Sequence, residues 1–374
     1  MSTVRGTLDC RSEQTYRINF LRAGQARQCT WDGGDILVSI GIPRALLYYL
    51  HFPHWRRFLQ ELGFKVILSP PTTARILNQG AAVTVDEVCA PVKVFFGHVL
   101  ELRDQADCIL VPRYVSVERG AYICPKLMGL PDMLTHSQAR LPPLFSPNID
   151  LRRGTFALLS PMLEAGRFLS RSAWPIVRAY YRSRQEGRRL ERQLLTGLTP
   201  EEAFHGLKYR RTPGRRLRIA LLGHAYNVYD PTLSMNLADH LRALDIDVCT
   251  AEMLPAEKVA WGLACIGGKE LFWTLSRRVL GAGMYYLRHP HEVDGMITLS
   301  SFGCGLESLV GDLMARAARR EQFPFMLLNI DEHSGEAGLV TRVEAFVDMI
   351  RGRGTDARNI PAHGDARARV AGAT

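Results

Sequence analysis

The chain has 374 residues, a net charge of +10 and a hydrophobic fraction of 47%. This length exceeds what one ordinary hydrophobic core uses and fits two domains, and the composition is that of a soluble globular protein. No apolar run reaches the roughly 18 residues of a membrane helix, and the N-terminus MSTVRGTLDC lacks a signal-peptide pattern. We therefore expect a cytoplasmic protein outside the membrane, whose eight cysteines stay reduced and form no disulfide framework.

Short apolar runs rich in Val and Ile alternate with helical patterns along most of the chain. In chain order, the predicted strands are 35–41, 64–70, 106–112, 217–223, 246–253, 294–301 and 325–331. The predicted helices are 43–62, 72–79, 232–243, 268–281, 306–319 and 336–351. This alternation predicts parallel sheets that are covered by helices on both faces, and therefore an α/β fold class.

The two halves of the sequence have similar patterns. QELGFKVILSP and RALDIDVCTAEM each end a helix and lead into a second strand, and ADCILVP corresponds to VDGMITLSS. We predict two similar Rossmann- or flavodoxin-like parallel-sheet domains, 35–150 and 216–351, joined by a basic helical connector, 151–215. Ligands of such sheets bind outside the carboxyl ends of the strands, so the crevice between the domains is the expected site. Residues 1–34 show little pattern, and 352–374 are predicted to be a disordered tail.

Basic residues are concentrated between Arg178 and Arg218, where twelve Lys and Arg occur with four acidic residues. The stretch RSRQEGRRLER has helical spacing, whereas Pro213 and Gly214 interrupt KYRRTPGRRLR. We interpret the segment as a solvated helix followed by an interdomain connector. A docking surface for an acidic partner or a phosphate-bearing ligand is the alternative. Aromatic residues are sparse and no nucleic-acid-binding motif accompanies the charge, so we do not expect nucleic-acid binding.

Five of the cysteines carry no signal for chemistry. Cys108 and Cys249 lie in strand patterns and Cys265 lies at the end of an apolar helix. We expect these three to be buried packing residues. Cys10 and Cys29 lie in the N-terminal segment, where the sequence does not define their surroundings.

The other three cysteines, Cys89, Cys124 and Cys304, each precede a helical run. Pro91 and Pro125 follow the first two closely, and proline is favoured in the first turn of a helix. At a helix start, the free N–H groups and the positive end of the dipole favour a thiolate over a thiol. The three thiols could converge on one crevice as metal ligands, or one could be a nucleophile. A small buried residue at a strand–helix corner is the alternative for each.

Seven stretches of the sequence carry a resemblance to a known family. They are IGIPRALLYY, ELGFKVILSP, DEVCAPVKVFFGH, YICPKLMGLPD, GHAYNVYDP, VDGMITLSSFGCGLESLV and NIDEHSGEAGLVTRVEAFVD. Over residues 37–351 the chain resembles the acyl-CoA dehydratase activase-related proteins. These are relatives of the 2-hydroxyacyl-CoA dehydratase subunits and of the double-cubane iron–sulfur reductases.

The resemblance implies an oxygen-sensitive iron–sulfur cluster held by three cysteines between two α/β domains. Carried over position by position, the ligands are Cys89, Cys124 and Cys304, with a [4Fe–4S] cluster preferred over a double-cubane [8Fe–9S] cluster. Three thiolates leave one iron of a [4Fe–4S] cluster for water, substrate or another ligand. In the dehydratase relatives, electron transfer to an acyl-CoA thioester gives a ketyl radical from which hydroxide leaves. The electron comes from an ATP-hydrolysing activase.

Several functions stay open at this stage. The sequence has no G-x-x-x-x-G-K-[ST] motif, and the actin-like activase domains that precede this region in longer relatives are absent from it. We therefore expect that the chain does not itself hydrolyse ATP and that the activase is a separate polypeptide. The chain is then a dehydratase- or reductase-type enzyme acting on an acyl-CoA, or a non-catalytic electron-relay or scaffold subunit. A three-cysteine zinc protein is a further alternative, and a homodimer or heterodimer is also open.

Polar residues near the three cysteines are candidates for hydrogen bonding, proton transfer or charge compensation. They are Glu87, Lys93, His224, Tyr226, Asp230, Asp331, Glu332, His333 and Glu336. Ordinary loop capping is the alternative for Asp230. For Asp331, Glu332, His333 and Glu336 the alternative is an N-capped helix start with Ser334 as the cap. Lys93 and His98 are five residues apart and do not share a helix face, so we expect His98 only to cap or pack.

Overall fold

The computed structural model of the chain describes residues 15–20, 27–32, 38–137, 139–152, 162–163, 173–207, 216–267 and 271–359. The chain divides into two compact units, Met1–His333 and Ser334–Thr374. Two four-stranded sheets lie in the first unit, and the second unit contains one described helix, α14 (Glu336–Asn359). None of the described helices combines the length and the apolar character needed to cross a membrane.

The first sheet has the strand order β4-β3-β5-β7, and all its neighbours pair in parallel. Its strands are β3 (Ser39–Ile42), β4 (Lys65–Leu68), β5 (Cys108–Leu110) and β7 (Leu144–Phe145). The helices that connect these strands are α1 (Tyr48–Glu61), α2 (Ala74–Ala81), α3 (Ala90–Leu102), α4 (Pro125–Met128) and α5 (Leu130–His136). A separate two-stranded parallel sheet pairs β6 (Arg113–Ser116), which follows β5 in the chain, with β8 (Asn148–Asp150), which follows β7.

The second sheet has the order β10-β9-β11-β12 and is also fully parallel. Its strands are β9 (Arg218–Leu222), β10 (Asp247–Thr250), β11 (Gly295–Ser301) and β12 (Phe325–Ile330). The connecting helices are α9 (Ala225–Tyr229), α10 (Leu237–Ala243), the short 3-10 helix η2 (Ala251–Met253), α11 (Ala256–Ala264), α12 (Thr274–Arg288) and α13 (Gly305–Arg320).

The two sheets share one topology. In each, the first strand (β3 or β9) has the second strand on one side and the third on the other, so the chain reverses direction across the sheet at that point. Ligands of open α/β sheets bind outside the carboxyl ends of the strands at this reversal. The predicted α/β fold class with two parallel sheets is confirmed, and the shared strand order agrees with the similarity of the halves.

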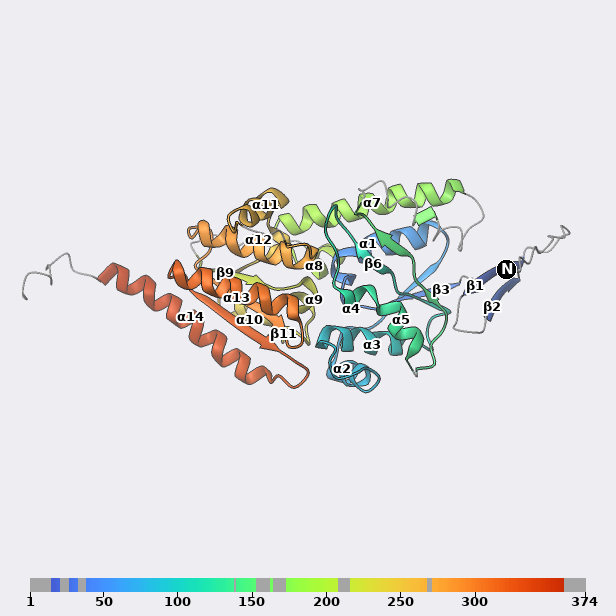
Figure 1. The fold of residues 1–374 in the computed structure, drawn as a ribbon, viewed down its shortest axis with the longest axis horizontal. Coiled ribbons are helices and arrows are strands. Elements are labelled where there is room, and N and C mark those ends of the chain that lie inside the picture. Colours follow the sequence, from blue (N-terminus) through green and yellow to red (C-terminus); the bar gives the residue numbers. More distant parts are fainter. Residues whose placement is uncertain are drawn as a thin grey trace, which may run out of the picture. The chain divides into compact units, whose positions relative to one another are not determined.

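One long helix, α7 (Ala173–Leu195), contacts elements of both halves (Figure 1). It packs along α1 and also contacts η2. The face that includes Ile176, Tyr180 and Leu190 is buried, whereas Arg182 is exposed and bonds Glu61 at 2.8 Å. The helical spacing predicted for RSRQEGRRLER is confirmed, and helix α8 (Pro200–Phe204) follows. Most of KYRRTPGRRLR lies outside the described residues.

The structure differs from the predicted elements in several places, among them the strands β6, β7 and β8, which were not predicted. The segment 1–34 contains an antiparallel pair, β1 (Thr15–Phe20) and β2 (Arg27–Asp32), and the polar–apolar alternation in TYRINF is the strand signal that we missed. Helix α14 continues to Asn359 and takes up the first part of the predicted tail, whose remainder is not described. The apolar helix expected to end at Cys265 is α11, for which no start was predicted, and the helix predicted at 268–281 begins at Thr274. The helix predicted at 232–243 begins only at Leu237, because the chain turns through a left-handed Asn236.

Candidate functional site

Three cysteines occupy the same local position in three helices. Cys89 is the N-cap residue of α3, Cys124 that of α4 and Cys304 that of α13. Proline stands in the first turn of α3 and α4, where its missing N–H costs no helical hydrogen bond. The prediction that these cysteines begin helices is confirmed. The backbone N–H groups of Val92 and Glu307, in the first turns of α3 and α13, lower the pKa of the Cys89 and Cys304 thiols, against the effect of burial.

The loops that carry these cysteines meet at one place. A Cβ added at Gly303 would lie 3.8 Å from the Cα of Cys89, so the loop before α13 approaches the loop before α3. The Lys126 ammonium donates to the carbonyl of Glu87 at 2.8 Å and to the carbonyl of Gly303 at 3.3 Å. Because Lys126 follows Cys124 by two residues, one side chain connects all three cysteine loops.

The glycine before Cys304 is required by the backbone. Gly303 has φ of +77°, which is the left-handed region that other residues adopt only with strain. This conformation turns the chain sharply between the end of β11 and the start of α13. Gly303 thus positions the thiol of Cys304 at the start of α13.

Burial determines the protonation of two of the thiols. It raises the pKa of the Cys89 thiol to about 11, although the nearby Lys126 acts in the opposite direction. Burial also raises the pKa of the Cys304 thiol, and the charges of Glu307, Cys89 and Cys124 add to that effect. Desolvation thus opposes the preference for a thiolate that the helix start gives Cys89 and Cys304. Thiol ligands release their protons when a metal binds.

A buried carboxylate organises the site on the side of the second sheet. Glu307 is 4% exposed, and both its oxygens accept hydrogen bonds. The donors are the backbone N–H groups of His224 (3.1 Å) and Ser301 (2.8 Å) and the side-chain amide of Asn227 (2.8 Å). These bonds join the loop after β9 to the loop after β11, at the reversal point of the sheet. Glu307 was not among the predicted site residues, although an acidic residue one turn after Cys304 is a signal the sequence contains.

His224 and Tyr226 lie beside this carboxylate. The Tyr226 hydroxyl is 2.7 Å from His224 Nδ1, which is 3.1 Å from Glu307 Oε1. Burial lowers the pKa of His224, so the imidazole is neutral, and its Nε2 has no hydrogen-bond partner among the described residues. One ligand atom each of His224, Cys304 and Glu307 lies within 4.8 Å of the others. Burial raises the pKa of Tyr226, and the charges of Glu307 and of all three cysteines add to this, which places the phenol near them.

Two predicted residues from opposite halves form one ion pair. Lys93, on α3, is 3% exposed, and its ammonium bonds the carboxylate of Glu332, which follows β12. The two residues are 239 positions apart in the sequence. Because Glu332 already compensates Lys93, this lysine is not a spare positive charge for the cysteines.

The remaining predicted residues lie elsewhere or have structural roles. The Glu87 side chain is exposed, and only its carbonyl contributes to the site. His333 is exposed, and Asp331 accepts from its backbone N–H at 2.9 Å. Asp230 caps its own loop, since its Oδ1 accepts from Thr232 N at 2.9 Å and from Leu233 N at 3.0 Å. Ser334 and Glu336 belong to the second unit.

The cysteines expected to be packing residues are buried to different degrees. Cys108 is 1% exposed in β5, whereas Cys249 and Cys265 are half-buried, so the prediction of burial is right for Cys108 and too strong for the other two. Cys10 and the side chain of Cys29 lie outside the part of the chain that the structure describes.

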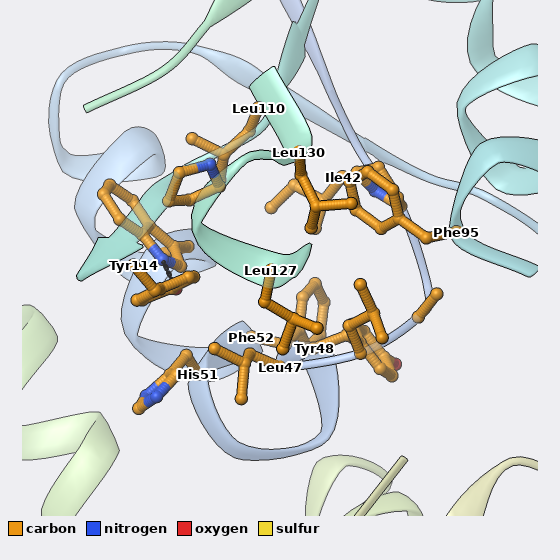
Figure 2. A pocket seen from close by; sticks show the side chains of 15 residues that line it. Ile42, Leu47, Tyr48, His51, Phe52, Phe95, Leu110, Tyr114, Leu127 and Leu130 are labelled. Carbon is orange, nitrogen blue, oxygen red and sulfur yellow. Dashed lines mark hydrogen bonds between the residues drawn. The ribbon is translucent and has the colours of Figure 1, made fainter. Parts of the chain in front are cut away.

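An apolar pocket of about 50 Å³ lies against α4 and α5 (Figure 2). Leu127 and Leu130 enter it from those helices, and Leu47, Tyr48 and Phe52 line it from the start of α1. The space is the size of one or two water molecules and is too small for a substrate. Its role is structural: Leu127 fixes the short helix that Cys124 begins.

Comparison with known proteins identifies the family. A search of curated proteins gave no match. Among solved structures, the chain is similar to the periplasmic binding ribose operon repressor protein from Lactobacillus acidophilus, at 12% identity over 84% of this chain and 90% of that one. The TM-score of 0.19 is too low to support any argument. The family model described as "CoA enzyme activase uncharacterised domain (DUF2229)" matches residues 39–254, which contain Cys89, Cys124, His224 and Tyr226. With more than half of its length matched, the chain belongs to this CoA enzyme activase domain family.

Proposed function

We propose that the chain is an iron–sulfur protein of the 2-hydroxyacyl-CoA dehydratase-related reductase group. Cys89, Cys124 and Cys304 are the proposed ligands of a [4Fe–4S] cluster, and a separate ATP-hydrolysing activase is the proposed electron donor. An acyl-CoA is the proposed substrate class. The observation that carries the proposal is that Lys126, two residues after Cys124, bonds the loops that carry Cys89 and Cys304. The family description supports the acyl-CoA dehydratase system as the context.

The donor set fits such a group. Thiolates are soft ligands that select iron–sulfur clusters and zinc. Each thiol lies at the N-terminus of a helix, where the dipole and the free N–H groups favour an anion. Lys126 adds a positive charge beside Cys89. A bound [4Fe–4S] cluster would supply one-electron transfer and one iron with an open position.

The neighbouring residues have separate roles in this proposal. Glu307 positions the loops of His224 and Ser301, because both its oxygens already accept hydrogen bonds and neither is free to ligate a metal. The neutral imidazole of His224 and the phenol of Tyr226 lie beside Cys304 and orient polar groups bound there. The Lys93–Glu332 pair holds α3 against the loop after β12.

Anaerobic purification followed by iron and acid-labile sulfide analysis tests the proposal. We expect a brown protein that contains iron and sulfide in equal amounts, about four of each per chain. A colourless protein with one zinc ion and no sulfide would contradict the proposal, and so would a protein that binds neither metal after reconstitution. Turnover of acyl-CoA thioesters with a reduced activase then separates an enzyme from an electron-relay or scaffold subunit, which would be reduced without consuming substrate.

A three-cysteine zinc site is the second candidate. One observation favours it: His224 offers a nitrogen near Cys304, and three cysteines with one histidine are a common set for structural zinc. Under this alternative, His224→Ala lowers zinc affinity, whereas a cluster held by three cysteines keeps its full iron content in the same variant.

Lys126 is expected to retain the cluster. We predict that Lys126→Met loses bound iron about tenfold faster than wild type on exposure to a chelator, because two charge-assisted hydrogen bonds between the cysteine loops disappear. Lys126→Arg keeps the charge and should retain most of the iron. Lys65→Met, at an exposed lysine of β4, is the matched control and should leave iron loss unchanged. If Lys126→Met and wild type lose iron at equal rates, Lys126 does not help to retain the cluster.

A further inference from the structure

A second cavity of about 710 Å³ lies within the first unit, apart from the cysteines. Residues of α1, α7, α11 and α12 line it, and most of them are apolar. They include Leu50, Leu190, Leu194, Val259, Leu263 and Val279. The volume falls within the range of about 300–1,000 Å³ that is typical of small-molecule sites. The cavity extends to His224, whose imidazole belongs to the candidate metal site.

A glycine in the middle of α7 widens this cavity. Gly187 lines the cavity, and a Cβ added there would meet no atom within 4 Å. By contrast, the helical glycines Gly80, Gly97, Gly262 and Gly281 are each in close contact with the backbone of a neighbouring helix. Close packing therefore does not require Gly187. Since glycine inside a helix costs about 1 kcal/mol relative to alanine, its presence here is explained by the space it leaves.

The charges inside the cavity favour an anion. Three guanidinium groups, those of Arg184, Arg277 and Arg278, are half-buried in the lining, together with one half-buried carboxylate, that of Glu252. Arg278 is held by two backbone carbonyls. The guanidinium of Arg277 has no hydrogen-bond or ion-pair partner among the described residues. Two further acids of the lining, Glu118 and Glu191, are exposed at its edge with Arg188.

Two histidines of α1 add neutral hydrogen-bonding groups. Burial lowers the pKa of His51 and of His54 to about 4, so both are uncharged at neutral pH. The Nε2 atoms of both are buried without a hydrogen-bond partner among the described residues. A buried polar group without a partner is destabilising unless a ligand or water satisfies it. Both residues line the cavity and can bond the oxygens of a ligand inside it.

We propose that this cavity binds a hydrophobic carboxylic acid. The hydrocarbon part lies against the leucines and valines of α7, α11 and α12, and the carboxylate pairs with Arg277. His51 and His54 supply further hydrogen bonds. The proposal goes beyond the cluster-binding function and does not rest on it, because none of the residues that carry it, Arg277, His51 and His54, is a proposed cluster ligand.

Calorimetric titration of the full-length, metal-free protein with dodecanoate tests this proposal. Four probes are compared below their micellar concentrations: dodecanoate, 1-dodecanol, dodecanoyl-CoA and coenzyme A. We expect dodecanoate to bind at least tenfold more tightly than 1-dodecanol, since the alcohol matches its chain and lacks the charge. No binding of dodecanoate, equal binding of the alcohol, or binding of the CoA thioester alone would each overturn the proposal.

Two variants connect the binding to this cavity. Arg277→Gln should weaken dodecanoate binding about tenfold and leave 1-dodecanol unaffected, whereas Arg189→Gln, an exposed arginine of α7 outside the lining, should change neither. Gly187→Leu should weaken binding of both, because the new side chain takes up part of the space that the hydrocarbon chain would occupy. Its unfolding temperature should be equal or higher, since leucine is the better helix former. If Gly187→Leu binds dodecanoate with unchanged affinity, dodecanoate does not bind in this cavity and the proposal is wrong. Iron content is measured separately, so failure here leaves the cluster proposal intact.

Discussion

Replacing Cys89, Cys124 or Cys304 with serine is expected to remove most of the iron from anaerobically reconstituted protein. Serine has nearly the size of cysteine, but its oxygen is a poor iron ligand. Losing one of three thiolates leaves two, too few to hold a cluster firmly. Folding should survive, because all three positions are N-caps without a side-chain bond and serine is a favoured N-cap residue. Iron per chain and the visible spectrum are measured for each variant.

Matched substitutions at the other cysteines separate ligation from general damage. Cys108→Ser places a hydroxyl in a fully buried strand and should lower stability while leaving iron per folded chain unchanged. Cys265→Ser, at the half-buried end of α11, should change neither property. If Cys304→Ser keeps its full iron content with an unaltered spectrum, the three-cysteine assignment is wrong.

The architecture could be predicted because its signal is local. Runs such as LRIALLG and DGMITLSS are mostly apolar over a strand length, and each is followed by a helical period. Their order along the chain then requires parallel sheets. Element limits were less predictable. Helix α12 begins at Thr274 and α10 at Leu237, since tertiary contacts and a left-handed turn residue determine where those helices start.

The sequence predicted only those features of the candidate site that follow from where helices begin. Proline and glycine identified Cys89, Cys124 and Cys304, but burial by the surrounding structure raises the pKa of two of these thiols, and no local pattern reports that burial. Lys126 was missed because its two acceptors lie 39 and 177 residues away in sequence. Both members of the Lys93–Glu332 pair were predicted, but their pairing was not, for the same reason.

The largest effect on stability outside the cysteines is expected at Asp230. This carboxylate is 1% exposed and connects the two halves of the first unit. Its Oδ1 accepts from two backbone N–H groups of its own loop, while its Oδ2 accepts from the hydroxyls of Thr72 and, at 3.2 Å, Tyr49. Asp230→Ala leaves four donors unsatisfied in a buried place. We expect it to lower the free energy of unfolding by about 3 kcal/mol in urea titrations. Asp239→Ala, at a 75% exposed carboxylate, should stay within about 0.5 kcal/mol of wild type.

Asp230→Asn distinguishes the charge of this residue from its hydrogen bonds. The amide oxygen can still accept from the loop, and its NH₂ group can donate to the two hydroxyl oxygens, so the loss should be smaller than for alanine. Burial raises the pKa of Asp230 in the folded protein above its ordinary value of 3.8. A raised folded pKa gives stability that is complete below the unfolded pKa and is lost as pH rises through the folded pKa. Wild type should therefore lose stability relative to Asp230→Asn as the pH rises above about 4 and through the folded pKa of Asp230. A difference between the two proteins that is constant over this range, or that grows in favour of wild type with pH, would show that the folded protein does not penalise the charge of Asp230.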